Sequence, residues 1–159
     1  MSYAIADDPV ETSLRRYASR PMVAIYALIV AGSWLAWPWF AFNSFALGSA
    51  TKRRELTLLA ISILGSIALA WGMFELVAIG VIHPGTQLLL ARLGVATFKI
   101  VLACQIASLQ RDAVQVHIYD GAAIEFHLPV FHVGNAIAML VLTTFSDPLI
   151  RVVLEGVRV

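Results

Sequence analysis

The sequence predicts an all-α membrane protein: a bundle of about four transmembrane helices, with a small β-hairpin outside the membrane and a short amphipathic helix at the C-terminus. Three observations lead to this fold class. Hydrophobic residues make up 60% of the 159 residues and charged residues only 13%, whereas a soluble domain has about 25% charged residues. A short segment, 114–128, alternates between apolar and polar residues. Outside it, the apolar residues gather in four long runs, at about 22–42, 56–82, 86–109 and 129–146.

The composition also limits the function. The net charge of +1 argues against a nucleic-acid-binding protein, which would carry a basic face. The single cysteine, Cys104, lies inside an apolar run, so we expect a small buried hydrophobic side chain there and no thiolate metal site. The sequence contains no internal repeat. We therefore expect one membrane domain over 1–159, without a metal or cofactor.

Residues 1–20 are polar and balanced in charge, which is typical of a segment that leads into the membrane at its surface. The following run, 21–50, contains no charged residue and is longer than the about 20 residues that one spanning helix needs. Two interpretations stay open. The run is either one span at about 22–42 that is kinked at Pro38, or a span followed by a re-entrant hairpin that bends at Pro38. The second agrees better with the rule that basic loops lie on the inner side.

The runs 56–82 and 86–109 predict two antiparallel membrane helices, because the helix breaker His83-Pro84-Gly85 joins them. In the first of these runs, Gly65, Ala68 and Gly72 recur at steps of three and four residues and lead to Glu75. Small residues at this spacing let two helices approach closely in lipid. We therefore expect Glu75 to lie in a packed seam between the helices.

Charged residues inside the two runs are the first candidates for a functional site. Glu75 precedes His83 by eight residues and Arg92 follows Pro84 by eight, so the two side chains should reach the same depth. Lys99 lies two helical turns beyond Arg92, on the same face. Because charges at such depth are costly unless they are paired, the sequence predicts a buried polar seam of Glu75, Arg92 and Lys99 with a Glu75–Arg92 ion pair.

The segment 114–128 predicts the β-hairpin. Residues 114–119 and 124–128 alternate with a period of two on either side of Asp120-Gly121, a common turn sequence. The polar face of this hairpin would carry Gln115, His117 and Glu125. An exposed strand edge can pair with an extended segment of another protein, so these residues form the predicted partner-binding edge.

The last run, 129–146, begins with His132 and Asn135, for which we predict a polar contact between helices. After it, Asp147 and Pro148 have the residue types favoured at the N-cap and first position of a helix. The residues that follow place apolar side chains on one face. We therefore expect a short amphipathic helix on the membrane surface.

The stretch 37–55, WPWFAFNSFALGSATKRRE, has a proline in the first span and an asparagine before a basic loop, and three further apolar runs follow it. In this pattern it resembles small bacterial inner-membrane proteins. The resemblance covers roughly half of the chain. It implies a location in the bacterial inner (cytoplasmic) membrane and no particular activity.

The leading prediction is a non-catalytic membrane interaction protein or accessory subunit, because the sequence lacks catalytic triad and phosphate-loop patterns. Its partners would be membrane lipid and another protein, and one specific version is immunity-type protection against a membrane-acting toxin. The alternative is a small ion or proton transporter that uses Glu75 with Arg92 and Lys99. A third possibility is a membrane metalloenzyme that uses the histidines and carboxylates of 117–132.

Overall fold

The computed structural model describes residues 14, 17–83, 85–119, 133–134, 136–137, 140, 144 and 146–155. Within these ranges the chain is helical and contains no strand, which confirms the all-α class. Two of the helices are long and apolar enough to cross a membrane. The helices whose first and last residues lie within the described ranges are α1 (Pro21–Val30), α2 (Ser33–Ala46), α3 (Lys52–Ala78), α4 (Thr86–Tyr119) and α6 (Pro148–Leu154).

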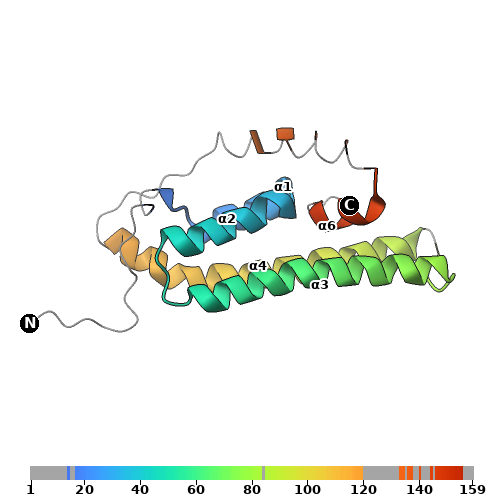
Figure 1. The fold of residues 1–159 in the computed structure, drawn as a ribbon, viewed down its shortest axis with the longest axis horizontal. Coiled ribbons are helices and arrows are strands. Elements are labelled where there is room, and N and C mark those ends of the chain that lie inside the picture. The colour runs from blue at the N-terminus through green and yellow to red at the C-terminus, as the bar shows by residue number, and fades with distance from the viewer. Residues whose placement is uncertain are drawn as a thin grey trace, which may run out of the picture.

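The two membrane-length helices, α3 and α4, lie side by side and antiparallel (Figure 1). Their 27 and 34 residues correspond to lengths of about 40 and 51 Å, so both exceed a hydrocarbon layer of about 30 Å. Gly65 lets them approach closely, because a Cβ atom at this position would lie 2.5 Å from Cζ of Phe98. This part of the predicted small-residue seam does pack against α4.

The first apolar run forms a helical hairpin, α1–α2, instead of one span. The chain reverses at Gly32, whose φ of 104° lies in the left-handed region that glycine tolerates. With 10 and 14 residues, α1 and α2 are about 15 and 21 Å long, so neither crosses the membrane alone. The single kinked span is therefore wrong. The re-entrant alternative agrees better with the structure, because the chain does form a hairpin. The observed bend, however, lies at Gly32 and not at Pro38, which is inside α2.

Asn43 fastens the two ends of this hairpin together. Its Oδ1 accepts a hydrogen bond from the Ser19 amide at 3.1 Å, and its Nδ2 donates to the Ser19 carbonyl at 3.1 Å. Trp39 Nε1 donates to Ser19 Oγ at 2.6 Å. Asn43 and Ser19 are both buried, so these bonds replace the water that the polar groups would otherwise bind.

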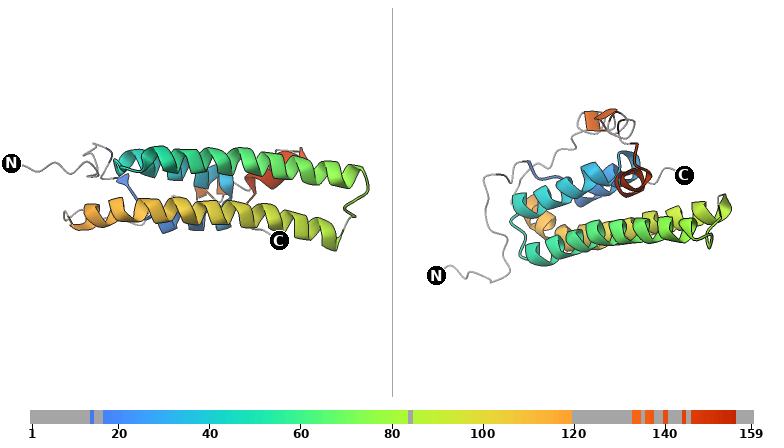
Figure 2. Two further views of the ribbon diagram at one scale, coloured as in Figure 1. Left: turned by 90° about the horizontal axis from the view of Figure 1, so that it is seen from below. Right: turned by 45° about the vertical axis from the view of Figure 1, so that its right-hand side comes forward.

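The hairpin and the short helix α6 lie on the same side of the α3–α4 pair (Figures 1 and 2). The hairpin covers the half of the pair that contains the start of α3, where Trp37 Nε1 donates to Ser62 Oγ at 3.2 Å. Helix α6 covers the other half, near Phe74. The core beneath the hairpin is built from small and aliphatic side chains with one aromatic ring, among them Ala24, Leu28, Ala36, Phe40 and Ile106.

The predicted first strand of the β-hairpin is wrong, because residues 114–119 continue α4 to Tyr119. Val114 and His117, one helical turn apart, are both buried, whereas Gln115 and Val116 are exposed. The burial therefore follows the helical period, not the period of two. The predicted turn and second strand, 120–128, lie outside the described residues.

The C-terminal helix is present as α6. Oδ1 of its N-cap, Asp147, accepts a hydrogen bond from the Leu149 amide at 2.8 Å, as its residue type predicts. Of the predicted fourth span, 129–146, the structure describes only 133–134, 136–137, 140, 144 and 146, and this prediction stays untested. Gly134, one of these residues, faces Leu35 of α2.

Candidate functional site

Arg92, one of the predicted seam residues, forms its ion pair with Glu155 at the end of α6. Arg92 Nη2 lies 2.8 Å from Glu155 Oε2, and Arg151 Nη2 lies 4.0 Å from Glu155 Oε1. The predicted pairing of Arg92 with Glu75 is therefore wrong. The Arg92 side chain is 44% exposed and that of Glu155 16% exposed, so solvent or lipid headgroups weaken this pair.

The register of the two long helices explains the error. Helix α3 ends at Ala78 and α4 begins at Thr86, so the midpoint of the connection is residue 82 and not the His83-Pro84 bond. Glu75 consequently lies level with about Leu89, nearly one helical turn away from Arg92. Glu75 is also exposed, so the expectation that it lies in a packed seam is wrong too.

Lys99, in contrast, is buried, with 3% of its surface exposed. Its Nζ donates to three backbone carbonyls at the end of α6: those of Val152 and Val153 at 3.2 Å and that of Glu155 at 2.8 Å. An ammonium group has three hydrogens. All of them are thus used to cap carbonyls that a helix C-terminus leaves without partners inside the helix.

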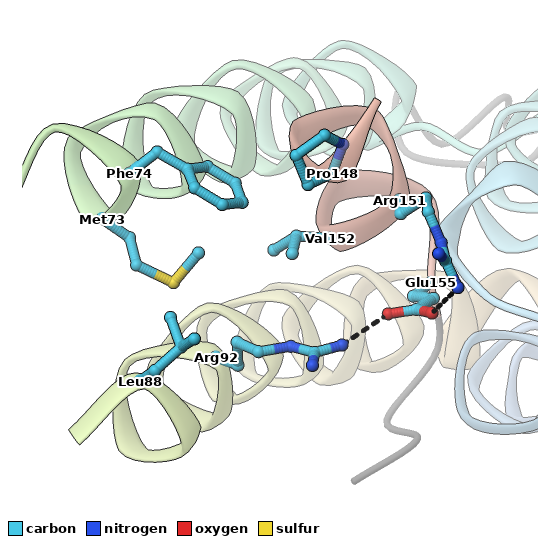
Figure 3. Close-up of a pocket in the computed structure, with 8 residues that line it drawn as sticks. All are labelled: Met73, Phe74, Leu88, Arg92, Pro148, Arg151, Val152 and Glu155. Carbon is cyan, nitrogen blue, oxygen red and sulfur yellow. Dashed lines mark hydrogen bonds and ion pairs between the residues drawn. The ribbon is translucent and has the colours of Figure 1, made fainter. Parts of the chain in front are cut away.

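A cavity of about 240 Å³ lies beside this ion pair, between α3, α4 and α6 (Figure 3). Arg92, Arg151 and Glu155 line one side, where the dashed lines of Figure 3 mark their contacts. The remaining lining side chains are apolar: Met73, Phe74, Leu88, Pro148 and Val152. The cavity therefore combines an apolar wall with two arginines that share one carboxylate, so its charged side carries a net charge of +1.

A second buried polar group surrounds Glu55 in the first turn of α3, and we call it the Glu55 cluster. It consists of Ser44, Ser49, Thr51, Glu55 and Gln110, which come from α2, the following loop, α3 and α4. Glu55 Oε1 accepts hydrogen bonds from Ser49 Oγ and, at 2.6 Å, from Thr51 Oγ1. Glu55 Oε2 accepts from Ser44 Oγ at 2.6 Å and from Gln110 Nε2 at 3.0 Å.

This cluster joins the base of the hairpin to both long helices. Glu55 is 1% exposed and Gln110 is fully buried. The positive end of the α3 dipole, together with four donors, stabilises a carboxylate at this place. Glu55 was not predicted as a site residue, because the neighbouring Lys52 and Arg53 are typical of a charged membrane flank. The three hydroxyl residues shortly before it were the signal that could have revealed it.

The other predicted site residues do not form one site. Gln115 is exposed and His117 is 2% exposed, so the two cannot share a polar edge. Glu125, His132 and Asn135 lie outside the described residues. Cys104 is exposed, contrary to the expectation of a buried side chain.

The arrangement offers hydrogen bonds and ion pairs between the helices. Within the described ranges, no three His, Cys, Asp or Glu side chains gather as metal ligands. Comparison of the chain with protein-family models, curated sequences and solved structures finds no match. Over the described residues, fold and site thus define an all-helical protein with two membrane-length helices.

Proposed function

We propose that this chain is a non-catalytic integral membrane interaction protein or accessory subunit, and that the outer face of α3 binds a helix of a partner protein. The observation that carries the proposal is the orientation of Glu75. With Ala68 and Gly72 it forms a small-residue surface of the kind that packs helices in lipid. Ala68 and Glu75 are exposed, and Gly72, which is half-buried, has open space where a side chain would be.

The outer face of α3 comprises residues at steps of three and four: Ile61, Leu64, Ala68, Gly72 and Glu75. All are exposed except Gly72, which is half-buried. A Cβ atom at Gly72 would meet nothing within 4 Å, whereas one at Gly65 would strike Phe98. The face therefore has room for the backbone of a second helix, and Glu75 at its end suits a basic residue of that helix.

The charges of Glu55, Lys99 and Arg92 support the same proposal, because each is engaged by a partner within the described chain. Four donors surround Glu55, three carbonyls occupy Lys99, and Glu155 neutralises Arg92. The transporter alternative requires Glu75, Arg92 and Lys99 to form one path. The structure engages two of them with α6 and leaves Glu75 exposed on α3, so the geometry favours the interaction protein.

Membrane location is part of this proposal. The run between Glu55 and Glu75 is apolar and spans about 30 Å as a helix, the thickness of the hydrocarbon layer. We place the chain in the bacterial inner membrane. Membrane fractionation of cells that produce a tagged protein tests this location. Immunity-type protection against a toxin stays a prediction.

The partner is tested by purification of the tagged chain from its native membranes, followed by mass spectrometry. Gly72→Leu fills the outer face of α3 and should reduce recovery of a stoichiometric partner at least tenfold. Gly94→Leu is the matched control, because Gly94 is an exposed helical glycine of α4 that also has open space around it. Equal recovery with both variants contradicts the proposal.

A flux assay decides between the two function classes. Purified chain in liposomes should leave a proton gradient intact, because one exposed carboxylate does not provide successive sites across about 30 Å. A gradient that the wild-type chain dissipates, but the Glu75→Gln variant does not, would establish the transporter.

A further inference from the structure

A groove of about 640 Å³ lies between α1 and α4, on a different surface from the outer face of α3. We propose that this groove binds one anionic phospholipid, with an acyl chain along the apolar lining and the phosphate between Arg20 and Arg111. The site does not depend on the proposed protein partner, because it is formed by other helices.

The charges at the groove suit a phosphate. Arg20 precedes the first residue of α1, and Arg111 projects from α4; both line the groove and both are exposed. Neither forms an ion pair in the part of the chain that the structure describes. A guanidinium group donates two parallel hydrogen bonds to a phosphate, so an unpaired arginine at the start of α1 and another on α4 form a suitable clamp.

The part of the groove between the arginines and Cys104 suits an acyl chain; on the other side of Arg111 the groove continues along Val114, Gln115 and Ile118. Helices α1 and α4 run in opposite directions (Figure 1), so Ile25 and Cys104 lie at the same end, deeper than the arginines. From Arg111 to Cys104 the groove follows α4 for about 10 Å. Between them the lining is formed by Met22, Ala107 and Ser108, and the only polar atom among these side chains is one hydroxyl.

The position along the helices agrees with a lipid that lies in its normal orientation. Arg111 is level with the start of α3, where Lys52, Arg53 and Arg54 follow one another, because Gln110 bonds to Glu55. Basic residues at the end of a membrane helix mark the level of anionic headgroups. The deeper end of the groove then lies in the hydrocarbon layer, where the acyl chain belongs.

Native mass spectrometry of the purified full chain in detergent tests this site. The chain is titrated with phosphatidylglycerol or with phosphatidylcholine of the same acyl chains. Both lipids carry a phosphate, but the choline ammonium cancels its charge in phosphatidylcholine. We expect the wild type to bind phosphatidylglycerol about 30-fold more strongly, since about 1 kcal/mol of attraction between each arginine and the net negative charge corresponds to this ratio. Arg20→Gln/Arg111→Gln should lower the ratio to about 1, whereas Arg53→Gln/Arg54→Gln, exposed arginines of α3, should keep it.

The acyl-chain part of the site has its own test. Cys104→Phe fills the deep end and should weaken both lipids about tenfold, whereas Cys104→Ser should not. Because Arg20 adjoins the hairpin base, Arg111→Gln alone provides a variant outside the hairpin and should lower the ratio about fivefold. Three results would each overturn the proposal. They are equal binding of the two lipids by the wild type, an unchanged binding ratio in the arginine variants, and a wild-type chain that forms a dimer and binds no lipid.

Discussion

The Glu55 cluster provides the sharpest test of the fold, because one carboxylate joins three segments of the chain. Glu55→Leu keeps a similar side-chain volume but removes the acceptor of four hydrogen bonds. A buried donor that loses its acceptor costs about 1–3 kcal/mol. Ser44 can turn its hydroxyl to the Phe40 carbonyl at 3.0 Å, and Gln110 also has this carbonyl at 3.1 Å. The hydroxyls of Ser49 and Thr51 lie 2.9 Å apart, so one can donate to the other. The one donor left without an acceptor predicts a destabilisation of about 3 kcal/mol, at the upper end of this range.

Two further variants separate the hydrogen bonds from the charge and from the helix. Glu55→Gln keeps one oxygen for Ser49 and Thr51, so we expect a loss of only about 1–2 kcal/mol. Glu75→Gln changes an exposed carboxylate of the same helix and should remain within about 0.5 kcal/mol of the wild type. The order of the three variants is therefore the prediction.

The assay is unfolding in mixed micelles, followed by tryptophan fluorescence. Three of the four tryptophans, Trp34, Trp37 and Trp39, lie in α2, so the signal reports on the hairpin that the cluster holds. If Glu55→Leu unfolds at the same denaturant concentration as Glu75→Gln, the cluster does not hold the hairpin and the reasoning is refuted.

Three further predictions concern α6 and the helix seam. Lys99→Met should leave three carbonyls at the end of α6 without their donor, cost about 3 kcal/mol and expose the C-terminus to protease; unchanged protease resistance would contradict the capping role. Arg92→Gln and Glu155→Gln should be non-additive by about 0.5–1 kcal/mol in a double-mutant cycle, and strict additivity would show that the pair contributes nothing. Gly65→Leu should destabilise the chain by about 2 kcal/mol because it meets a Phe98 ring, whereas Gly72→Leu should not, as thermal unfolding of both variants would show.

Composition and residue pattern predict the long elements of this chain correctly. Helices α3 and α4 follow from apolar runs that are too long for the core of a small domain, and α6 follows from the local signal Asp147-Pro148. The hairpin break at Gly32 was missed because a glycine inside an apolar run is a weak signal on its own. The position of the break depends on how the two short helices α1 and α2 pack against the longer helices α3 and α4. This packing cannot be predicted from the residues around Gly32 alone.

The predicted β-hairpin failed for a related reason. An alternation over only six residues is a weak signal, and in the helix Val114 is buried whereas Val116 and Ile118 are exposed. In the structure Val114 packs with Ala18 and Leu47 at the base of the hairpin, so tertiary contacts decide in favour of the helix. A short alternating segment next to a long helix is therefore better interpreted as an extension of that helix until a partner strand is found.

The candidate site shows the same limit for charged residues. The sequence identifies Glu75, Arg92 and Lys99 as charges in apolar runs, but their partners depend on where the helices end. The register of α3 and α4 places Arg92 nearly one helical turn from Glu75. The partners of Arg92 and Lys99 lie at the end of α6, more than fifty residues further along the chain. Glu55 was overlooked because neighbouring basic residues gave it the appearance of a solvated flank.

The arrangement of short elements supports the proposal that Lys99 has a structural role. The hairpin and α6 cover successive halves of the α3–α4 pair and meet beside one another (Figures 1 and 2). A helix that ends inside a membrane leaves carbonyls that only protein groups can satisfy. Lys99 supplies all three of its hydrogens to them, so a proton leaving this ammonium would remove a donor from the end of α6. Transport through Lys99 would thus require α6 to lose its cap in every cycle, whereas an interaction protein needs that cap to stay in place.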